Sequence, residues 1–340
     1  MFKKLVLATC GVILAAALLP LTSAQAQTVL TSSSWVPPGH TLTRTIIEWG
    51  KELEAATQGR IKLTMLPKTP TNPPGTYDSV RDGLQDVGFT VQGYTPGRFA
   101  LAPLAELPFL GDSAEASSVA FQRMAVKYPQ ILEEYKGVKV LAVFTHGPGI
   151  IYNSKRPVTS MADLAGLKFR VGGGMVNEIG KAIGANVMLK PASESYELMS
   201  SGVVDGVFFP AESIPGFKLD KLIKFGTTFP GGLYNTAFVM MMNQDKYNKL
   251  SAQDKAAVDK LSGENLARMQ GRGWDKVDRE GKALMQAAGV NIQPANAAFI
   301  KEIENRVAQF EQKWVADATA KGIKNPQNVI KEFRAEIKKL

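Results

Sequence analysis

One arginine stands inside a stretch of sequence that otherwise has the pattern of a buried strand. In DLAGLKFRVGGG, residues 163–174, apolar side chains alternate with Lys168 and Arg170, and three glycines follow. An unpaired charge is costly to bury, so the guanidinium of Arg170 requires an anionic partner. That partner is either a structural acid such as Asp163 or Asp205, or the acidic group of a ligand. The residues of this stretch leave both possibilities open.

The other residue types do not assemble a catalytic or cofactor site. The sequence has two histidines, His40 and His146, and no GxSxG motif, so no nucleophile has a base beside it. The separated histidines and irregularly spaced carboxylates give no metal-binding pattern. VGGGM, residues 171–175, lacks the GxGxxG spacing of a dinucleotide loop. We predict no catalytic residues, no metal and no cofactor, and we favour a binding protein over an enzyme.

Three further side chains occur in loops that follow predicted strands. Trp35 lies in SSWVPPG, Tyr94 in QGYTPGRF and His146 in FTHGPG. Ligands of parallel α/β sheets bind at strand ends, where such side chains can line a pocket. Aromatic rings in these loops can equally cover the core, and a loop histidine can serve only to hydrogen-bond the backbone. The sequence leaves both roles open.

The N-terminal segment has the pattern of a secretory signal peptide. A short basic start precedes an apolar run over residues 5–21, and the small residues of SAQA follow. We predict that residues 1–26 are removed and that the mature protein is located in the periplasm. Cys10 is the only cysteine, so the predicted mature chain has no disulfide.

Length and charge exclude some classes of function. The 340 residues carry 40 Lys and Arg against 31 Asp and Glu, a net charge of +9 that falls to +7 without the two lysines of the signal peptide. The charges are scattered singly, with no basic block among aromatic residues, so no nucleic-acid partner is expected. Without disulfides the mature chain depends on its hydrophobic core, and its length suffices for two domains.

Hydrophobic periodicity predicts alternating strands and helices. Apolar residues recur at helical spacing over residues 42–53, and short helix, turn and strand units follow along the chain. Such alternation is typical of parallel sheets that are covered by helices.

The C-terminal third is predicted to be largely helical. A helical pattern of unusual length extends over residues 251–288, and it contains Gly271 and Gly273, where we expect a bend or a junction. An apolar stripe over residues 300–314 predicts a helix packed on the core. A last helix is expected over residues 326–339.

Four segments resemble those of one family of binding proteins, in the order in which that family has them. They are APLAELPFL (102–110), NSKRPVTSMADLAGLKFRV (153–171), YELMSSGVVDGVFFP (196–210) and VMMMNQDKYNKLS (239–251). The chain is similar to the solute-binding subunits of tripartite ATP-independent periplasmic (TRAP) transporters, the DctP-type family. The likeness covers nearly the whole mature chain.

The resemblance implies an α/β fold of the two-lobed periplasmic-binding-protein type (type II-like), in which each lobe is a mostly parallel sheet flanked by helices. Residues 27–147 and 236–272 would form the first lobe, and residues 148–235 and 273–340, with the C-terminal helices, the second. The long helix would span both lobes, and the lobes would close over a ligand by a hinge motion. The chain would act as a monomer that captures a small-molecule organic acid for the membrane subunits of a TRAP transporter.

The resemblance also gives Arg170 a role, because KFRV matches the family's segment that ends on the carboxylate-binding arginine. A guanidinium offers two parallel donors to a carboxylate. Many members have a second arginine where this chain has Gly149, and a polar residue near the position of Phe208 and Phe209. We therefore expect one cationic anchor and an apolar wall, hence a monocarboxylate with an apolar or aromatic body.

The expected ligand-binding residues are Arg170 for the carboxylate, Phe209 and Phe208 for the body, and Tyr94, His146, Trp35 or Asn235 for a hydroxyl or oxo group. The same fold would also serve a binding subunit of an ABC importer or a periplasmic sensor. Two further alternatives are less favoured. The missing catalytic residues argue against an enzyme on a two-lobed scaffold, and the expected ligand-binding cleft argues against a purely structural envelope protein.

Overall fold

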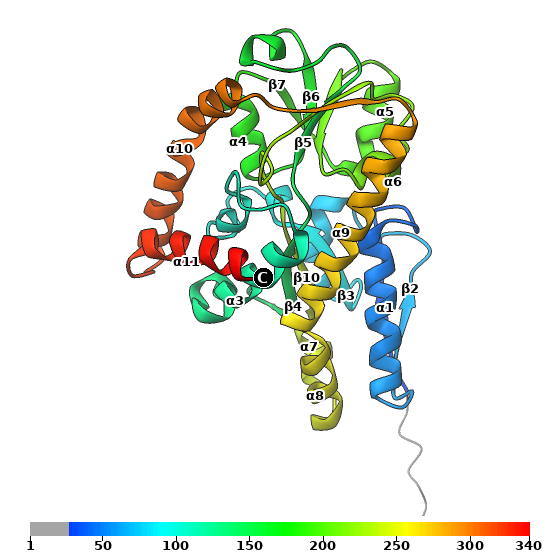
Figure 1. Cartoon of the computed structure of the whole chain (residues 1–340). Helices are drawn as coiled ribbons and strands as arrows, with labels where there is room; N and C mark the ends of the chain where they lie inside the picture. Colours follow the sequence, from blue (N-terminus) through cyan, green and yellow to red (C-terminus); the bar gives the residue numbers. More distant parts are fainter. Residues whose placement is uncertain (1–26) are drawn as a thin grey trace, which may run out of the picture.

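The computed structural model describes residues 27–340. The predicted signal peptide of residues 1–26, with Cys10, lies outside the described residues. Figure 1 shows two lobes, each built on its own sheet, with the long helix α9 (Glu264–Ala287) running alongside both. Within the described residues, no helix has the length and the apolar character that crossing a membrane requires.

The sheet of the first lobe has five strands in the order β2-β1-β3-β10-β4. β1 pairs in parallel with β2 and β3, whereas β10 runs antiparallel to both of its neighbours. Every residue of β3 and β10 is buried, as expected of central strands that are covered on both faces. The strands are β1 (Thr28–Ser32), β2 (Ile61–Met65), β3 (Val87–Val91), β4 (Val138–Thr145) and β10 (Ala237–Asn243).

The sheet of the second lobe has six strands in the order β11-β9-β5-β8-β6-β7. β5 is antiparallel to β8 and β9, and the other pairs are parallel. The strands are β5 (Ile150–Asn153), β6 (Lys168–Val171), β7 (Asn186–Leu189), β8 (Gly206–Phe209), β9 (Phe225–Thr228) and β11 (Asn291–Pro294). The predicted α/β fold of two lobes with mostly parallel sheets is confirmed.

In each sheet, the antiparallel strand is the one that the chain forms directly after it crosses from the other lobe. The chain passes from β4 to β5 through residues 146–149 and returns from β9 to β10 through residues 229–236. We call these two stretches the crossover segments. They hydrogen-bond to each other, since the amide of Gly149 donates to the carbonyl of Tyr234 at 2.8 Å and the amide of Leu233 to that of Gly149 at 3.0 Å. The junction between the lobes is therefore a short paired ribbon, the geometry of a hinge.

Helices cover the sheets on both lobes. The predicted apolar face of the first helix is buried, with Trp49 at its centre, and the ring of His40 caps the N-terminus by accepting from the amide of Leu42 at 3.2 Å. The α-helices are α1 (Thr41–Ala56), α2 (Thr76–Arg81), α3 (Ala114–Lys127), α4 (Met175–Ala182), α5 (Ser195–Ser200), α6 (Ser213–Gly216), α7 (Gln244–Asn248), α8 (Ala252–Leu261), α9, α10 (Ala297–Ala320) and α11 (Pro326–Lys339). Short 3-10 helices are η1 (Pro73–Gly75), η2 (Gln92–Tyr94), η3 (Ala102–Glu106), η4 (Pro129–Glu134), η5 (Met161–Leu164) and η6 (Ala192–Glu194).

The long helical pattern breaks earlier than its glycines predict. α8 ends at Leu261 and α9 begins at Glu264, after Gly263 with a φ of 61°. α9 then continues without interruption through Gly271 and Gly273, so the bend expected there is wrong. A Cβ on Gly271 would lie 2.4 Å from the Cα of Glu115 in α3. This glycine serves close packing of two helices rather than a bend.

The C-terminal helices connect the lobes a second time. α10 follows β11 of the second sheet and packs against α4, and α11 packs against α3 of the first lobe. The predicted apolar stripe of α10 faces inward, and Trp314 donates from Nε1 to the carbonyl of Leu101 at 3.0 Å. Residues 273–340 are predicted to belong to the second lobe, whereas α11 contacts α3 of the first lobe. The residue bounds of the lobes stay a prediction.

The packing at Gly271 gives a test of the fold. We expect Gly271→Ala to lower the free energy of unfolding by about 1–3 kcal/mol, because the new methyl group meets the backbone of α3 and the helices must separate. Gly39→Ala is the control, since nothing lies within 4 Å of its Cβ position. Urea unfolding of both variants measures the difference. Equal stability of the two variants would contradict the proposed role of Gly271 in α3–α9 packing.

Candidate ligand-binding site

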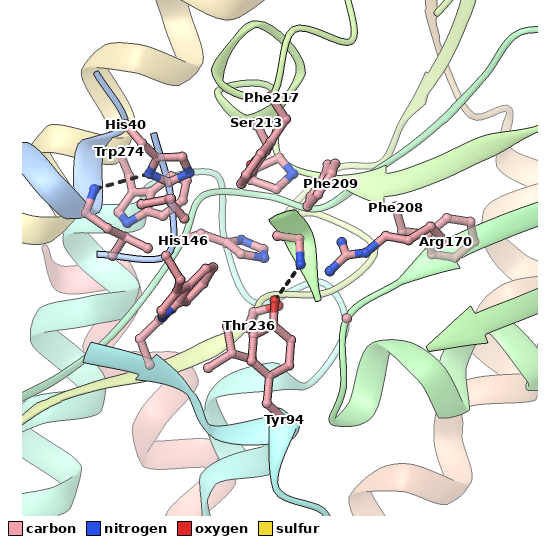
Figure 2. Close-up of a pocket in the computed structure, with 18 of the residues that line it drawn as sticks. His40, Tyr94, His146, Arg170, Phe208, Phe209, Ser213, Phe217, Thr236 and Trp274 are labelled. Carbon is pink, nitrogen blue, oxygen red and sulfur yellow. Dashed lines mark hydrogen bonds between the residues drawn. The ribbon is translucent and has the colours of Figure 1, made fainter. Parts of the chain in front are cut away.

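A cavity lies between the two lobes beside the crossover segments (Figure 2). The space inside it, counted together with the solvent at its open side, is about 420 Å³. Its walls are mostly aromatic with few polar groups, which is typical of a small-molecule site. The lining residues are Trp35, Val36, His40, Leu42, Val91, Tyr94, His146, Arg170, Gly172, Ala192, Phe208, Phe209, Pro210, Ser213, Phe217, Tyr234, Thr236, Phe238 and Trp274.

Arg170 projects from β6 into this cavity with only 2 % of the residue exposed. Its Nε donates to the carbonyl of Lys190 at 2.9 Å, and its guanidinium carbon lies 4.6 Å from the centroid of the Phe209 ring. Burial lowers the pKa of Arg170, but a guanidinium keeps its charge in proteins. No carboxylate among residues 27–340 forms an ion pair with it.

The acids that could have neutralised Arg170 are engaged elsewhere. Asp163 accepts hydrogen bonds from the amides and hydroxyls of Thr159 and Ser160. Asp205 accepts from the amide of Lys168 at 2.9 Å and lies 3.6 Å from Nζ of Lys155. The structural-acid explanation of Arg170 is therefore wrong, and its positive charge faces the cavity.

Two tyrosine hydroxyls complete the surroundings of the guanidinium. The hydroxyl of Tyr94, from the first lobe, accepts from the amide of Ala192 in the second lobe at 2.9 Å. Tyr234 also lines the cavity, and its hydroxyl has no hydrogen-bond partner among the described residues. Burial raises the pKa of both tyrosines, so both hydroxyls remain protonated and can donate. Arg170, Tyr94 and Tyr234 thus form a group of donors suited to a carboxylate.

The structure gives a reason for glycine at position 149. A Cβ there would lie 2.2 Å from Cε1 of Tyr234, so the tyrosine ring rests directly on the glycine backbone. A side chain as long as arginine has no room in this arrangement. At the position where the resemblance to the family would place a second arginine, this chain therefore presents the neutral ring and hydroxyl of Tyr234.

The apolar wall is built from rings of both lobes. Phe209 stacks on Phe217 with a centroid distance of 5.5 Å and an interplanar angle of 9°. On the first lobe, Trp35 packs against the ring of Tyr94 at 5.7 Å and donates from Nε1 to the carbonyl of Phe89 at 3.3 Å. A flat apolar body would be covered from both sides by these rings.

His146 lies on the first crossover segment and is 4 % exposed. Its Nδ1 lies 2.5 Å from the carbonyl oxygen of Gly147, which can only accept, so Nδ1 carries a proton. Burial, together with the charge of Arg170, lowers the pKa of His146 to about 4. The ring is therefore neutral, with an unprotonated Nε2.

Asn235 is the one predicted site residue that does not line the cavity. Its Nδ2 instead donates to the carbonyl of His146 at 2.8 Å and reaches that of Gly147 at 3.4 Å. It therefore links the two crossover segments and holds the main chain of His146 in place. The other six predicted residues, Arg170, Phe209, Phe208, Trp35, Tyr94 and His146, are brought together around the cavity, and their roles in binding stay a prediction.

Several lining residues were missed by sequence reasoning. They share no local motif, since they come from the termini of α1 and α6, the second crossover segment, β10 and the middle of α9. The missed side chains of most interest are His40, Ser213, Phe217, Tyr234, Thr236, Phe238 and Trp274. The one available signal was the position of Tyr234 after two glycines that interrupt the strand pattern.

The glycines after Arg170 serve contact between the lobes. Gly173 approaches the backbone of Gly93 so closely that a Cβ would lie 1.8 Å from its carbonyl oxygen. Next to it, the buried carboxylate of Glu106 accepts from the amide of Met175 at 2.7 Å and from the amide of Ala237 at 3.0 Å. Glu106 thereby caps α4 of the second lobe from the first.

A second buried acid cluster joins the lobes on the other side of the cavity. Glu212 accepts from the amide of Thr41 at 3.4 Å, and its Oε2 lies 3.4 Å from Nε2 of His40. The Oδ1 of Asp278 accepts from the amide of Glu212 at 2.7 Å. Burial and the carboxylate of Asp278 raise the pKa of Glu212 to about 8, and burial lowers that of His40 to about 3. Among residues 27–340, no group of three or more metal-binding side chains is present.

Comparison with known proteins gives one consistent result. The model of the family described as bacterial extracellular solute-binding protein, family 7 (DctP), matches residues 32–317. Among curated proteins, the chain is 30% identical to the protein named outer membrane transporter protein TsaT from Comamonas testosteroni, over 94% of this chain and 95% of that protein.

Two solved structures extend the similarity to the fold. A TRAP periplasmic solute-binding protein from Bordetella bronchiseptica, with bound (R)-mandelate and (S)-mandelate, is 45% identical with a TM-score of 0.89, covering 92% of this chain and 99% of that one. A marine metagenome TRAP solute-binding protein specific for aromatic acid ligands, in complex with 3-hydroxybenzoate, is 34% identical with a TM-score of 0.85 and the same coverage.

The buried acids make stability depend on pH. Between about pH 4.5 and 8 the native state keeps a proton on Glu212 that the unfolded state has released, so the free energy of unfolding falls as the pH rises through this range. We expect Glu212→Gln to reduce this fall by about 1 kcal/mol or more. Urea unfolding at several pH values from 5 to 8 measures it.

The control for this experiment is Glu304→Gln, which changes an exposed carboxylate on α10. Its stability should follow the wild-type pH profile. If Glu212→Gln also runs parallel to the wild type from pH 5 to 8, the raised pKa of Glu212 is refuted.

Proposed function

Because the chain belongs to the bacterial extracellular solute-binding proteins of family 7, we propose that it binds an aromatic monocarboxylate between its two lobes. The protein captures a small organic acid and delivers it to the membrane subunits of a TRAP transporter. Members of this family and the structural relatives are binding proteins of transport systems rather than enzymes. A binding subunit of an ABC importer or a periplasmic sensor is not favoured by these relatives.

The observation that carries the proposed ligand class is the buried guanidinium of Arg170 in an aromatic cavity. Its charge has no partner among the described acids, and two tyrosine hydroxyls beside it can donate to the same anion. A carboxylate would neutralise the charge and accept these hydrogen bonds. Bidentate pairing in a site from which water is excluded would be strong and directional.

The composition of the cavity supports one carboxylate rather than two. Arg170 is the only lysine or arginine among the lining residues, and the two lining histidines are neutral. A second carboxylate would be buried against aromatic rings with no cation, at a cost of several kcal/mol. The stacked rings of Phe209 and Phe217 would instead cover a flat apolar body. The aromatic acids bound by the two structural relatives agree with this ligand class.

Capture would proceed by closure of the lobes about the crossover segments. Arg170 belongs to the second lobe and Tyr94 to the first, and the Tyr94–Ala192 hydrogen bond joins them only when the lobes meet. The carboxylate would bind the donors of both lobes at once, so binding would stabilise the closed form. Ligand release would need the same contacts to open.

The cellular context follows from the sequence. Residues 1–26 have the pattern of a cleaved signal peptide, which would place the mature chain in the periplasm. There the chain would act as a monomer that binds the acid without converting it. N-terminal sequencing of the secreted protein would identify the cleavage site.

Replacement of Arg170 tests the anchor. We expect Arg170→Ala to weaken binding of mandelate or phenylacetate by at least about a hundredfold, and Arg170→Lys to weaken it substantially, because an ammonium group cannot present the parallel donors of the fork. Isothermal titration calorimetry gives the Kd, and circular dichroism checks the fold. Arg306→Ala, at an exposed arginine of α10, should bind as the wild type does. Unchanged affinity in folded Arg170→Ala would remove Arg170 from the site.

A ligand panel tests the class of acid. Benzoate, phenylacetate and mandelate should raise the melting temperature of the purified protein, because binding to the native state alone stabilises it. Succinate and glucuronate, which carry a second charge or a polar ring, should leave it unchanged. A response to these two acids without one to the aromatic acids would show that the apolar cavity is not the ligand site.

A further inference from the structure

We propose that His146 is a specificity-determining residue whose Nε2 accepts a hydrogen bond from a hydroxyl on the carbon next to the ligand's carboxylate. The protein would then select 2-hydroxy aryl acids over the corresponding 2-oxo acids and over unsubstituted aryl acids. This inference rests on the proposed function and adds a second point of recognition to the same cavity.

The tautomer of His146 is set by its backbone contact. Nδ1 must donate to the carbonyl of Gly147, 2.5 Å away, because a carbonyl oxygen has no proton to offer. A second proton on Nε2 would place a cation in a buried cavity that already holds the charge of Arg170. Nε2 therefore has a lone pair, and none of the described residues donates a hydrogen bond to it.

The position of the ring is fixed as well. It meets the ring of Tyr234 edge-on at 5.4 Å and lies 5.8 Å from Trp274 and 6.1 Å from Phe238. Asn235 holds the main-chain carbonyl of the same residue. Figure 2 shows His146 and Arg170 on facing sides of one space. A ligand anchored on the guanidinium would present its adjacent carbon to the imidazole.

The hydroxyls of the cavity, such as those of Tyr94, Tyr234 and Thr236, cannot make this distinction, because each can donate to an oxo group or accept from a hydroxyl. The Nε1 of Trp274 can only donate and has no partner among the described residues, but that atom is buried. The Nε2 of His146 can only accept. A hydroxyl donor would satisfy its lone pair, whereas an oxo oxygen would face that lone pair with no proton between them and lose its own hydration.

Four probes that share one carboxylate and one phenyl ring separate the possibilities. They are mandelate with a hydroxyl donor, 2-methoxy-2-phenylacetate with an acceptor only, benzoylformate with an oxo group, and phenylacetate with neither. We expect wild-type protein to bind one mandelate enantiomer at least about tenfold more tightly than each of the other three in calorimetric titrations at pH 7.5.

Two variants connect the preference to His146. In His146→Phe the preference for mandelate over phenylacetate should disappear while phenylacetate still binds. In His146→Gln, whose amide can donate or accept, mandelate and benzoylformate should bind within about threefold of each other. The second variant keeps a polar side chain and covers the case in which the first does not fold.

The outcomes separate this inference from the proposed function. Failure of all four probes to bind the wild type would refute the aromatic-acid cavity itself. Binding of phenylacetate and mandelate with equal affinity, or retention of the full mandelate preference in both folded variants, would refute the His146 subsite and leave the role of Arg170 intact.

Discussion

The site depends on one physical constraint, a guanidinium buried without an acid of the protein beside it. Burying such a charge is unfavourable, and the partial compensation visible here comes from the Lys190 carbonyl, the face of Phe209 and the tyrosines nearby. In the proposed function, an anionic ligand would supply the remainder. Because the lining residues include no second lysine or arginine, the same constraint that favours a carboxylate would also disfavour a ligand with two.

The two crossings of the chain between the lobes determine which groups would move if the lobes close over a ligand. His146 and Tyr234 belong to the paired crossover segments, so they would keep their places relative to each other if the lobes rotate. Arg170 and Tyr94 belong to different lobes and would meet only on closure. Recognition of the carboxylate would thus be coupled to closure, whereas the acceptor of His146 would be present at the hinge in either state. The groups that would drive closure lie on the two lobes, and the group proposed to select the ligand lies on the crossover segment between them.

Several glycines are needed because a distant segment of the chain packs directly against their backbone. Gly173 meets the backbone of Gly93 across the lobes, Gly149 carries the ring of Tyr234, and Gly271 lets α3 approach α9. The sequence marks these positions as unusual but does not say what approaches them, because the neighbour is far away along the chain. For that reason the predicted bend at Gly271 was wrong, and the glycines after Arg170 proved to be a contact between lobes.

The sequence by itself determined the fold class and singled out Arg170. Strand and helix periodicity depends on residues a few positions apart, and a lone arginine in an apolar strand is visible locally. The role of Arg170 as a carboxylate anchor was expected only from the resemblance to the family, and it stays a prediction. The sequence also pointed to Trp35, Tyr94 and His146 in loops after strands, where parallel sheets bring side chains together, and all three line the cavity. Only the tertiary structure decided that Asn235 supports the hinge, that Tyr234 takes the place open at Gly149, and that Asp163 and Asp205 are engaged away from Arg170. These are contacts between distant segments, and their distances and donor directions exist only once the chain has folded.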